Sequence, residues 1–114
     1  MKAIVKKIQG EQGASFKFAF IRDDGSALLR SARYRSKHSA YKGVRAVQKN
    51  CQSDNRYLVS ETPDGKHSFK IKSANGAPVV DSIDFSSEQE MQDAMNLIKL
   101  HVPGCEIAFQ KTQA

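Results

Sequence analysis

The chain lacks a long apolar run, and no segment approaches the roughly 20 apolar residues that a membrane-spanning helix needs. Its first segment, Met1 to Gln9, contains three lysines but no continuous apolar stretch, so it does not have the pattern of a secretion signal. We read it as a strand. These absences predict a cytoplasmic protein with no membrane partner.

Cysteine and histidine are scarce and scattered. Cys51 and Cys105 do not form a Cys-x-x-Cys motif, and the three histidines do not stand at metal-ligand spacing from them. We therefore predict no metal and no cofactor. In a reducing compartment each cysteine is expected to be a free thiol that packs as a small apolar residue, with a disulfide or a reactive thiol as the alternatives.

Patterns that indicate catalysis are also missing. The segment Asp23-Asp24-Gly25 lacks the ligand spacing of a calcium loop, and the glycines follow no phosphate-loop pattern. Ser36 has His38 nearby but no acid to orient that histidine as a base. We predict that the protein is not an enzyme and takes no small-molecule substrate.

What the chain does contain is an internal repeat at an offset of 51 residues. Under this shift Asp24-Gly25 coincides with Asn75-Gly76, Phe18 with Phe69, and Ser31 with Ser82. Self-similarity at a fixed period predicts a repeated structural unit. We expect one pseudo-symmetric domain over residues 1–114, with repeat 1 at about 1–51, repeat 2 at about 52–102 and a carboxy-terminal strand at 103–114.

Each repeat has the pattern of three strands and a helix. Phenylalanines alternate with other residues in the second strand, and the Asp-Gly and Asn-Gly turns indicate hairpins. Ser36 can cap a helix over about 37–50, where Gly43 beside the apolar stripe indicates close packing on the sheet, and Ser87 to Glu90 form a capping box. The sequence predicts an α+β fold of two tandem β-β-β-α repeats plus a C-terminal strand, forming one mainly antiparallel sheet with both helices packed on one face.

Charge is distributed unevenly, and it supplies the candidate site. Residues 1–57 carry a net charge of +9 and residues 58–114 a net −3, which points to an anionic partner or to contact between copies. On a helical wheel, four basic side chains of the first helix fall within about 60° of one another. They could neutralise phosphates, or they could be the solvated side of an amphipathic helix. The candidate nucleic-acid-binding residues are Arg33, Arg35, His38, Lys42, Arg45 and Lys49.

Two tyrosines lie near this basic face. Exposed aromatic rings stack on bases in single-strand binders, which is one reading of Tyr34 and Tyr41. Tyr34 coincides with Phe85 under the 51-residue shift, and this favours core packing where the strand meets the helix.

The first repeat carries a family resemblance. An aromatic strand and Asp24-Gly25 are followed by the runs SARYRSKHSA, from Ser31, and GVRAV, from Gly43. The pattern resembles the small bacterial domain family typified by YegP, whose function is unknown. The resemblance implies tandem three-strand-plus-helix units joined in one sheet, with strands exchanged between units. It implies no activity, and the second repeat departs from the helix pattern at Ala94-Met95.

Two hypotheses on function follow. The first is an interaction or accessory module that contacts a protein partner or another copy of itself, which should show an exposed apolar patch or an unpaired sheet edge. The alternative is weak, sequence-nonspecific nucleic-acid binding through the basic face of the first helix, which should weaken steeply with salt.

Overall fold

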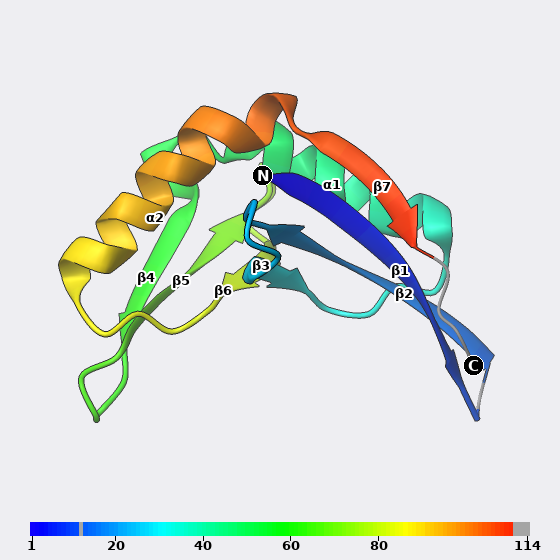
Figure 1. The fold of residues 1–114 in the computed structure, drawn as a ribbon, viewed down its shortest axis with the longest axis horizontal. Helices are drawn as coiled ribbons and strands as arrows, with labels where there is room; N and C mark the ends of the chain where they lie inside the picture. Colours follow the sequence, from blue (N-terminus) through cyan, green and yellow to red (C-terminus); the bar gives the residue numbers. More distant parts are fainter. Residues whose placement is uncertain (12, 111–114) are drawn as a thin grey trace.

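The computed structural model describes residues 1–11 and 13–110 (Figure 1). In this part of the chain the elements follow the predicted order of three strands, a helix, three strands, a helix and a strand. Gln12, in the first predicted turn, and residues 111–114 of the predicted last strand lie outside it. The bounds are β1 Lys2–Gly10, β2 Gly13–Ile21, β3 Ala27–Ser31, α1 Lys37–Asn50, η1 Asp54–Arg56, β4 Tyr57–Glu61, β5 His67–Lys72, β6 Pro78–Ser82, α2 Glu88–His101, η2 Val102–Gly104 and β7 Glu106–Gln110, where η marks a 3-10 turn.

The seven strands of the described chain form one sheet in the order β4-β5-β6-β3-β2-β1-β7. Every neighbouring pair is antiparallel except β1 and β7, which are parallel. Strands β3 and β6 join the two halves, and β7 returns from the end of the chain to lie beside β1. This arrangement confirms the predicted α+β class with a mainly antiparallel sheet.

Both helices lie against the same face of the sheet (Figure 1). Alternate strand residues point towards them, as Phe18 and Phe20 of β2 and Phe69 and Ile71 of β5 do, and each of these is at most 2% exposed. Together with the apolar stripes of α1 and α2 they form a single buried cluster. The core therefore occupies one side of the sheet.

Positions 51 residues apart make similar contacts. Phe16 of β2 and Tyr34, beyond the end of β3, form an isolated antiparallel bridge, and His67 of β5 and Phe85, beyond the end of β6, form another. In each bridge both backbone hydrogen bonds are made, at 2.6 to 2.8 Å. This contact brings the segment that leads into each helix back to the second strand of the same unit.

Hydroxyl caps start both helices, as predicted. Ser36 Oγ accepts the backbone N–H of Ser39 at 3.0 Å, and Ser87 Oγ accepts that of Glu90 at 3.1 Å. In a capping box the glutamate would return to the backbone of the cap residue. Here the Glu90 carboxylate accepts from the backbone N–H of Ser86 at 3.3 Å, so the reciprocal bond is displaced by one residue.

Gly43 marks the closest approach of α1 to the sheet. A Cβ at this position would lie 2.6 Å from Tyr34 Oη and 2.7 Å from the ring of Phe18, and real Cβ atoms almost never come so close to other atoms. The close packing predicted from this helix glycine is confirmed. Because α1 is held by this contact, the opposite side of the helix is fixed towards solvent.

Candidate functional site

The basic face of α1 is exposed because the buried stripe of the helix lies on its other side. Ala40, Val44 and Val47 are fully buried against the sheet. His38, at the start of the same helix, is exposed. An α-helix with an apolar stripe on one side must present its remaining side chains to water. The sequence places the cations here, and the packing of the stripe orients them.

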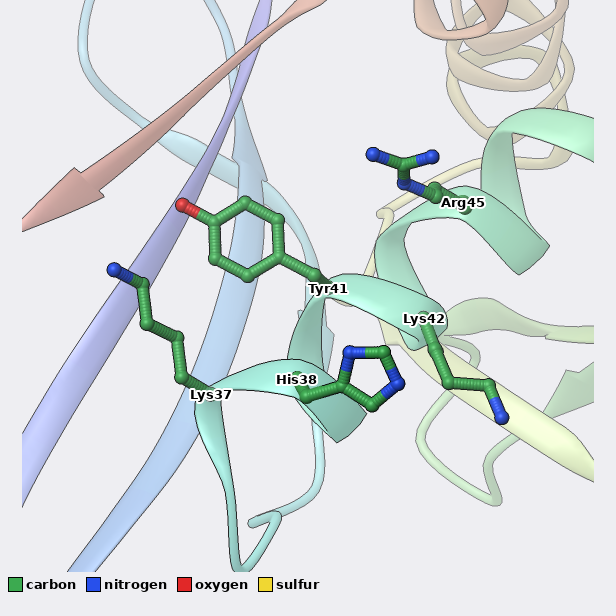
Figure 2. Close-up of a pocket in the computed structure, with 5 residues that line it drawn as sticks. All are labelled: Lys37, His38, Tyr41, Lys42 and Arg45. Carbon is green, nitrogen blue, oxygen red and sulfur yellow. The ribbon is translucent and has the colours of Figure 1, made fainter.

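A hollow of about 520 Å³ lies along this face. The side chains that border it all come from the first three turns of α1, but their polar ends do not converge on one point. In Figure 2 Lys37 and Tyr41 extend to one side, whereas His38 and Lys42 project from the other. Such a surface suits an extended ligand with repeated charges better than a small molecule. The lining residues are Lys37, His38, Tyr41, Lys42 and Arg45.

The structure brings together three of the six candidate residues, since only His38, Lys42 and Arg45 line the hollow. The others, Arg33, Arg35 and Lys49, are exposed but do not border it. None of the six makes an ion pair with any described residue. Whether they bind nucleic acid therefore stays a prediction.

Lys37 borders the hollow although it is not among the residues that the sequence singles out. Its ammonium group lies 3.9 Å from the centre of the Phe109 ring, a cation–π contact with strand β7. The contact depends on β7 returning to lie beside β1, which sequence periodicity does not reveal. In the sequence, the only signal for a role of Lys37 at this hollow is its position in the first turn of the helix.

The two tyrosines are both partly buried against the core. Tyr34 stacks on Phe18 with ring centres 5.9 Å apart and an angle of 21° between the planes. This supports core packing as the role of Tyr34. Burial also raises the pKa of its hydroxyl. Tyr41 lies under Lys37, whose ammonium group is 5.8 Å from the ring centre.

Three ionisable side chains near the end of α1 are held in their neutral forms. Burial raises the pKa of the Cys51 thiol from its ordinary value of 9.0 to about 11, and it also raises the pKa of Cys105. The pKa of Tyr57 is raised, again mainly by burial, and its hydroxyl donates to the carbonyl of Cys51 at 2.6 Å. A thiol held in this way is a poor nucleophile, because the reactive species is the thiolate.

An unpaired sheet edge forms a second candidate surface. Strand β4 is the last strand on its side of the sheet, and its Leu58 and Val59 are 50% and 49% exposed. Its pairing with β5 runs without a bulge from Tyr57 to Glu61, and the strand contains no lysine or proline. Bulges, lysines and prolines are the usual features that prevent pairing at an edge. This edge is therefore open to another strand.

Within the described residues, no helix is long and apolar enough to cross a membrane. No group of three or more histidine, cysteine or acidic side chains in this part of the chain is placed to hold a metal ion.

Comparison with known proteins places the chain in a family. Residues 12–57 match the profile of a domain of unknown function, DUF1508. The chain is 31% identical over 102 residues to a UPF0339 protein of Bordetella pertussis, an alignment that covers 90% of this chain and 91% of that protein. It is 29% identical over 86 residues to UPF0339 protein YegP of Escherichia coli, or 75% and 78% of the two chains. The chain belongs to the UPF0339 family, as its resemblance to YegP indicated.

Solved structures show the same fold. The solution structure of UPF0339 protein SO3888 from Shewanella oneidensis superimposes with a TM-score of 0.84 at 22% identity, covering 97% of this chain and 93% of the other. YegP of E. coli superimposes with a TM-score of 0.83 at 23% identity, covering 100% and 97%. The names of these relatives assign no activity to the family.

Proposed function

We propose that the protein is a non-enzymatic interaction module that binds another polypeptide by strand addition at β4. The observation that carries this proposal is the open edge of that strand, with two half-exposed apolar side chains and no bulge, lysine or proline; its one charged residue is Glu61, at the end of the strand. In strand addition the added backbone completes the ladder of hydrogen bonds, and side-chain pockets select the sequence.

The two faces of β4 offer different contacts to an added strand. Successive side chains of a strand point to opposite faces, so Leu58 and Val59 flank the edge on opposite sides. A partner strand with apolar residues at adjacent positions would cover both. Tyr57 extends the edge at one end, and Ser60 and Glu61 extend it at the other. The partner we expect is an extended segment with a short apolar centre.

The spread of the charged groups on α1 and the chemistry of the Cys51 thiol support a binding role over a catalytic one. The charged ends on α1 diverge, and the Cys51 thiol has its pKa raised to about 11, away from the range in which it would act as a nucleophile at neutral pH. A catalytic cysteine instead has its pKa lowered, so that the thiolate is present at neutral pH. We place the module in the cytoplasm. Cys51 and Cys105 are both free thiols, and free thiols persist in that reducing compartment.

A photo-crosslinking experiment tests the proposal. A benzophenone amino acid is placed at exposed Ser60 on β4 or, as the control, at exposed Gln92 on α2, and the protein is irradiated in cells. We expect a discrete adduct from position 60 that is absent from position 92. The adduct should disappear when Leu58→Lys and Val59→Lys close the edge. An adduct that survives these changes, or none from position 60, contradicts strand addition. An adduct of twice the chain mass identifies a second copy as the occupant.

A second candidate function is weak, sequence-nonspecific binding of nucleic acid through α1. It is favoured by the exposure of all six candidate residues, His38 included, and by the absence of ion pairs to them from the described residues. Cations that are not neutralised within the protein are available to phosphates.

A further inference from the structure

The face of the sheet opposite the helices contains a hollow of about 410 Å³ over β1, β2 and β3. The pairing register places its side chains together, since Ile4 lies opposite Ala19, and Ala19 lies opposite Arg30. Ala3 and Val5, on either side of Ile4, are fully buried under the helices. Because side chains alternate along a strand, Ile4 and its partners point to the other face.

The floor of this hollow is apolar and its rim is basic. Four half-buried apolar residues and three exposed cations border it. The apolar residues come from adjacent strands, so they form a continuous patch and not isolated exposures. The floor consists of Ile4, Ala19, Ile21 and Ala27, and the rim of Lys6, Lys17 and Arg30.

The arrangement of the rim charges lowers the stability of the sheet. Lys6 lies directly opposite Lys17 in the β1–β2 pair, and like charges in that position destabilise a strand pair. Arg30 lies opposite Asp81, but the carboxylate of Asp81 is 2.6 Å from the ammonium group of Lys70. No described residue forms an ion pair with Lys6, Lys17 or Arg30. An external acidic group would relieve this repulsion.

The combination of an apolar floor and a basic rim selects the occupant. A nucleic acid would satisfy the cations but would leave the isoleucines uncovered. Phe18 also borders the hollow, but its ring is buried and stacks on Tyr34, so it is not available to stack on bases. A strand cannot hydrogen-bond to the middle of a sheet. An amphipathic helix offers an apolar stripe for the floor and flanking carboxylates for the rim.

We infer that this face docks an acidic amphipathic helix of a partner protein, with apolar side chains over Ile4 and Ile21 and carboxylates beside Lys6, Lys17 and Arg30. The site is separate from the β4 edge, because β5 and β6 lie between β4 and the strands that line the hollow. The two surfaces can therefore be tested independently.

The experiment uses the whole chain labelled with nitrogen-15 and titrated with synthetic 18-residue helical peptides. The probe carries leucines along one stripe and glutamates on both flanks. One control peptide replaces the glutamates with lysines, and another has the acidic composition scrambled so that no stripe forms. We expect the acidic amphipathic peptide to shift the amide signals of Ile4, Ala19 and Ala27. The two controls should leave these signals in place.

Matched charge reversals locate the site. The changes Lys6→Glu, Lys17→Glu and Arg30→Glu should weaken peptide binding at least tenfold, whereas Lys7→Glu, Lys42→Glu and Lys66→Glu, at exposed positions away from the hollow, should not. Thermal unfolding checks that both triple variants fold.

Other outcomes overturn the inference. The absence of shifts over β1 to β3, or equal binding of the lysine peptide, excludes an acidic helix on this face. If duplex DNA shifts the same amide signals while the peptide does not, the face binds nucleic acid. Peptide-induced shifts confined to β4 would support the open edge but contradict this site.

Discussion

The side-chain hydroxyl of Ser31 accepts a hydrogen bond from the backbone N–H of Phe18 at 2.8 Å. The same hydroxyl donates to the carbonyl of Ala32 at 2.7 Å. In the second unit Ser82 accepts from the backbone N–H of Phe69 at 2.9 Å and donates to Ile83 at 2.8 Å. These serines, 51 residues apart, thus complete the sheet where a ladder bond is missing.

Ser31→Ala should therefore destabilise the protein. The change leaves the Phe18 amide without its acceptor beside the core, and an unsatisfied buried donor costs about 1–3 kcal/mol of unfolding free energy. Ser82→Ala should have a similar effect through Phe69. Urea unfolding measures both. Ser53→Ala is the control, because that exposed serine precedes η1 without a side-chain capping bond, and equal losses in all three variants would contradict the argument.

Gly43→Ala should also lower stability, although alanine is the better helix former. The added methyl group would meet Tyr34 Oη and the Phe18 ring, and overpacking costs about 1–3 kcal/mol, more than the gain of up to about 1 kcal/mol in helix propensity. Thermal unfolding should show a lower midpoint. Gly104→Ala is the control, since its Cβ would meet no atom within 4 Å. A more stable Gly43→Ala variant would show that α1 can move away from the sheet.

The fold is more predictable than the site because local patterns determine most of it. The bounds of α1 follow from the cap at Ser36 and the stripe through Val47, and the glycine turns define the hairpins. The order of strands is not accessible, because the β3–β6 and β1–β7 pairs join residues far apart in sequence. The contact of Lys37 with Phe109 depends on that order. The hollow over β1–β3 depends instead on the register of two sequential hairpins, which shifts between Phe20 and Ile21.

Stability should fall as pH rises from about 9 to about 11. The folded protein holds the Cys51 proton up to a pKa of about 11, whereas the unfolded chain releases it near 9.0, so the unfolded state binds fewer protons in this window. The raised pKa of Tyr57 acts in the same direction. Urea midpoints at pH 8, 9, 10 and 11 measure the effect. In Cys51→Ala the slope between pH 9 and 11 should become shallower, and an unchanged slope would assign it to other groups.

Alkylation of cysteine gives an independent check on the same thiol. At pH 8 the raised pKa lowers the thiolate fraction of Cys51 about 100-fold relative to an ordinary cysteine, and burial limits access further. Iodoacetamide should label Cys51 at the ordinary rate only after unfolding in urea. Mass spectrometry of the modified peptides measures the two rates. Rapid labelling of Cys51 in the folded protein would show that the end of α1 opens.

Nucleic-acid binding through α1 makes a prediction with a specific salt signature. The changes Lys42→Glu, Arg45→Glu and Lys49→Glu reverse three exposed cations of one helix face, so binding of labelled duplex DNA, single-stranded DNA and RNA should be lost. For the unsubstituted protein, the affinity for nucleic acid should fall steeply between low and near-physiological salt, because each neutralised phosphate releases counterions. Fluorescence anisotropy measures both effects. Lys2→Glu, Lys7→Glu and Lys66→Glu make the same change in net charge elsewhere. If they weaken binding equally, attraction is due to net charge and α1 is not a site.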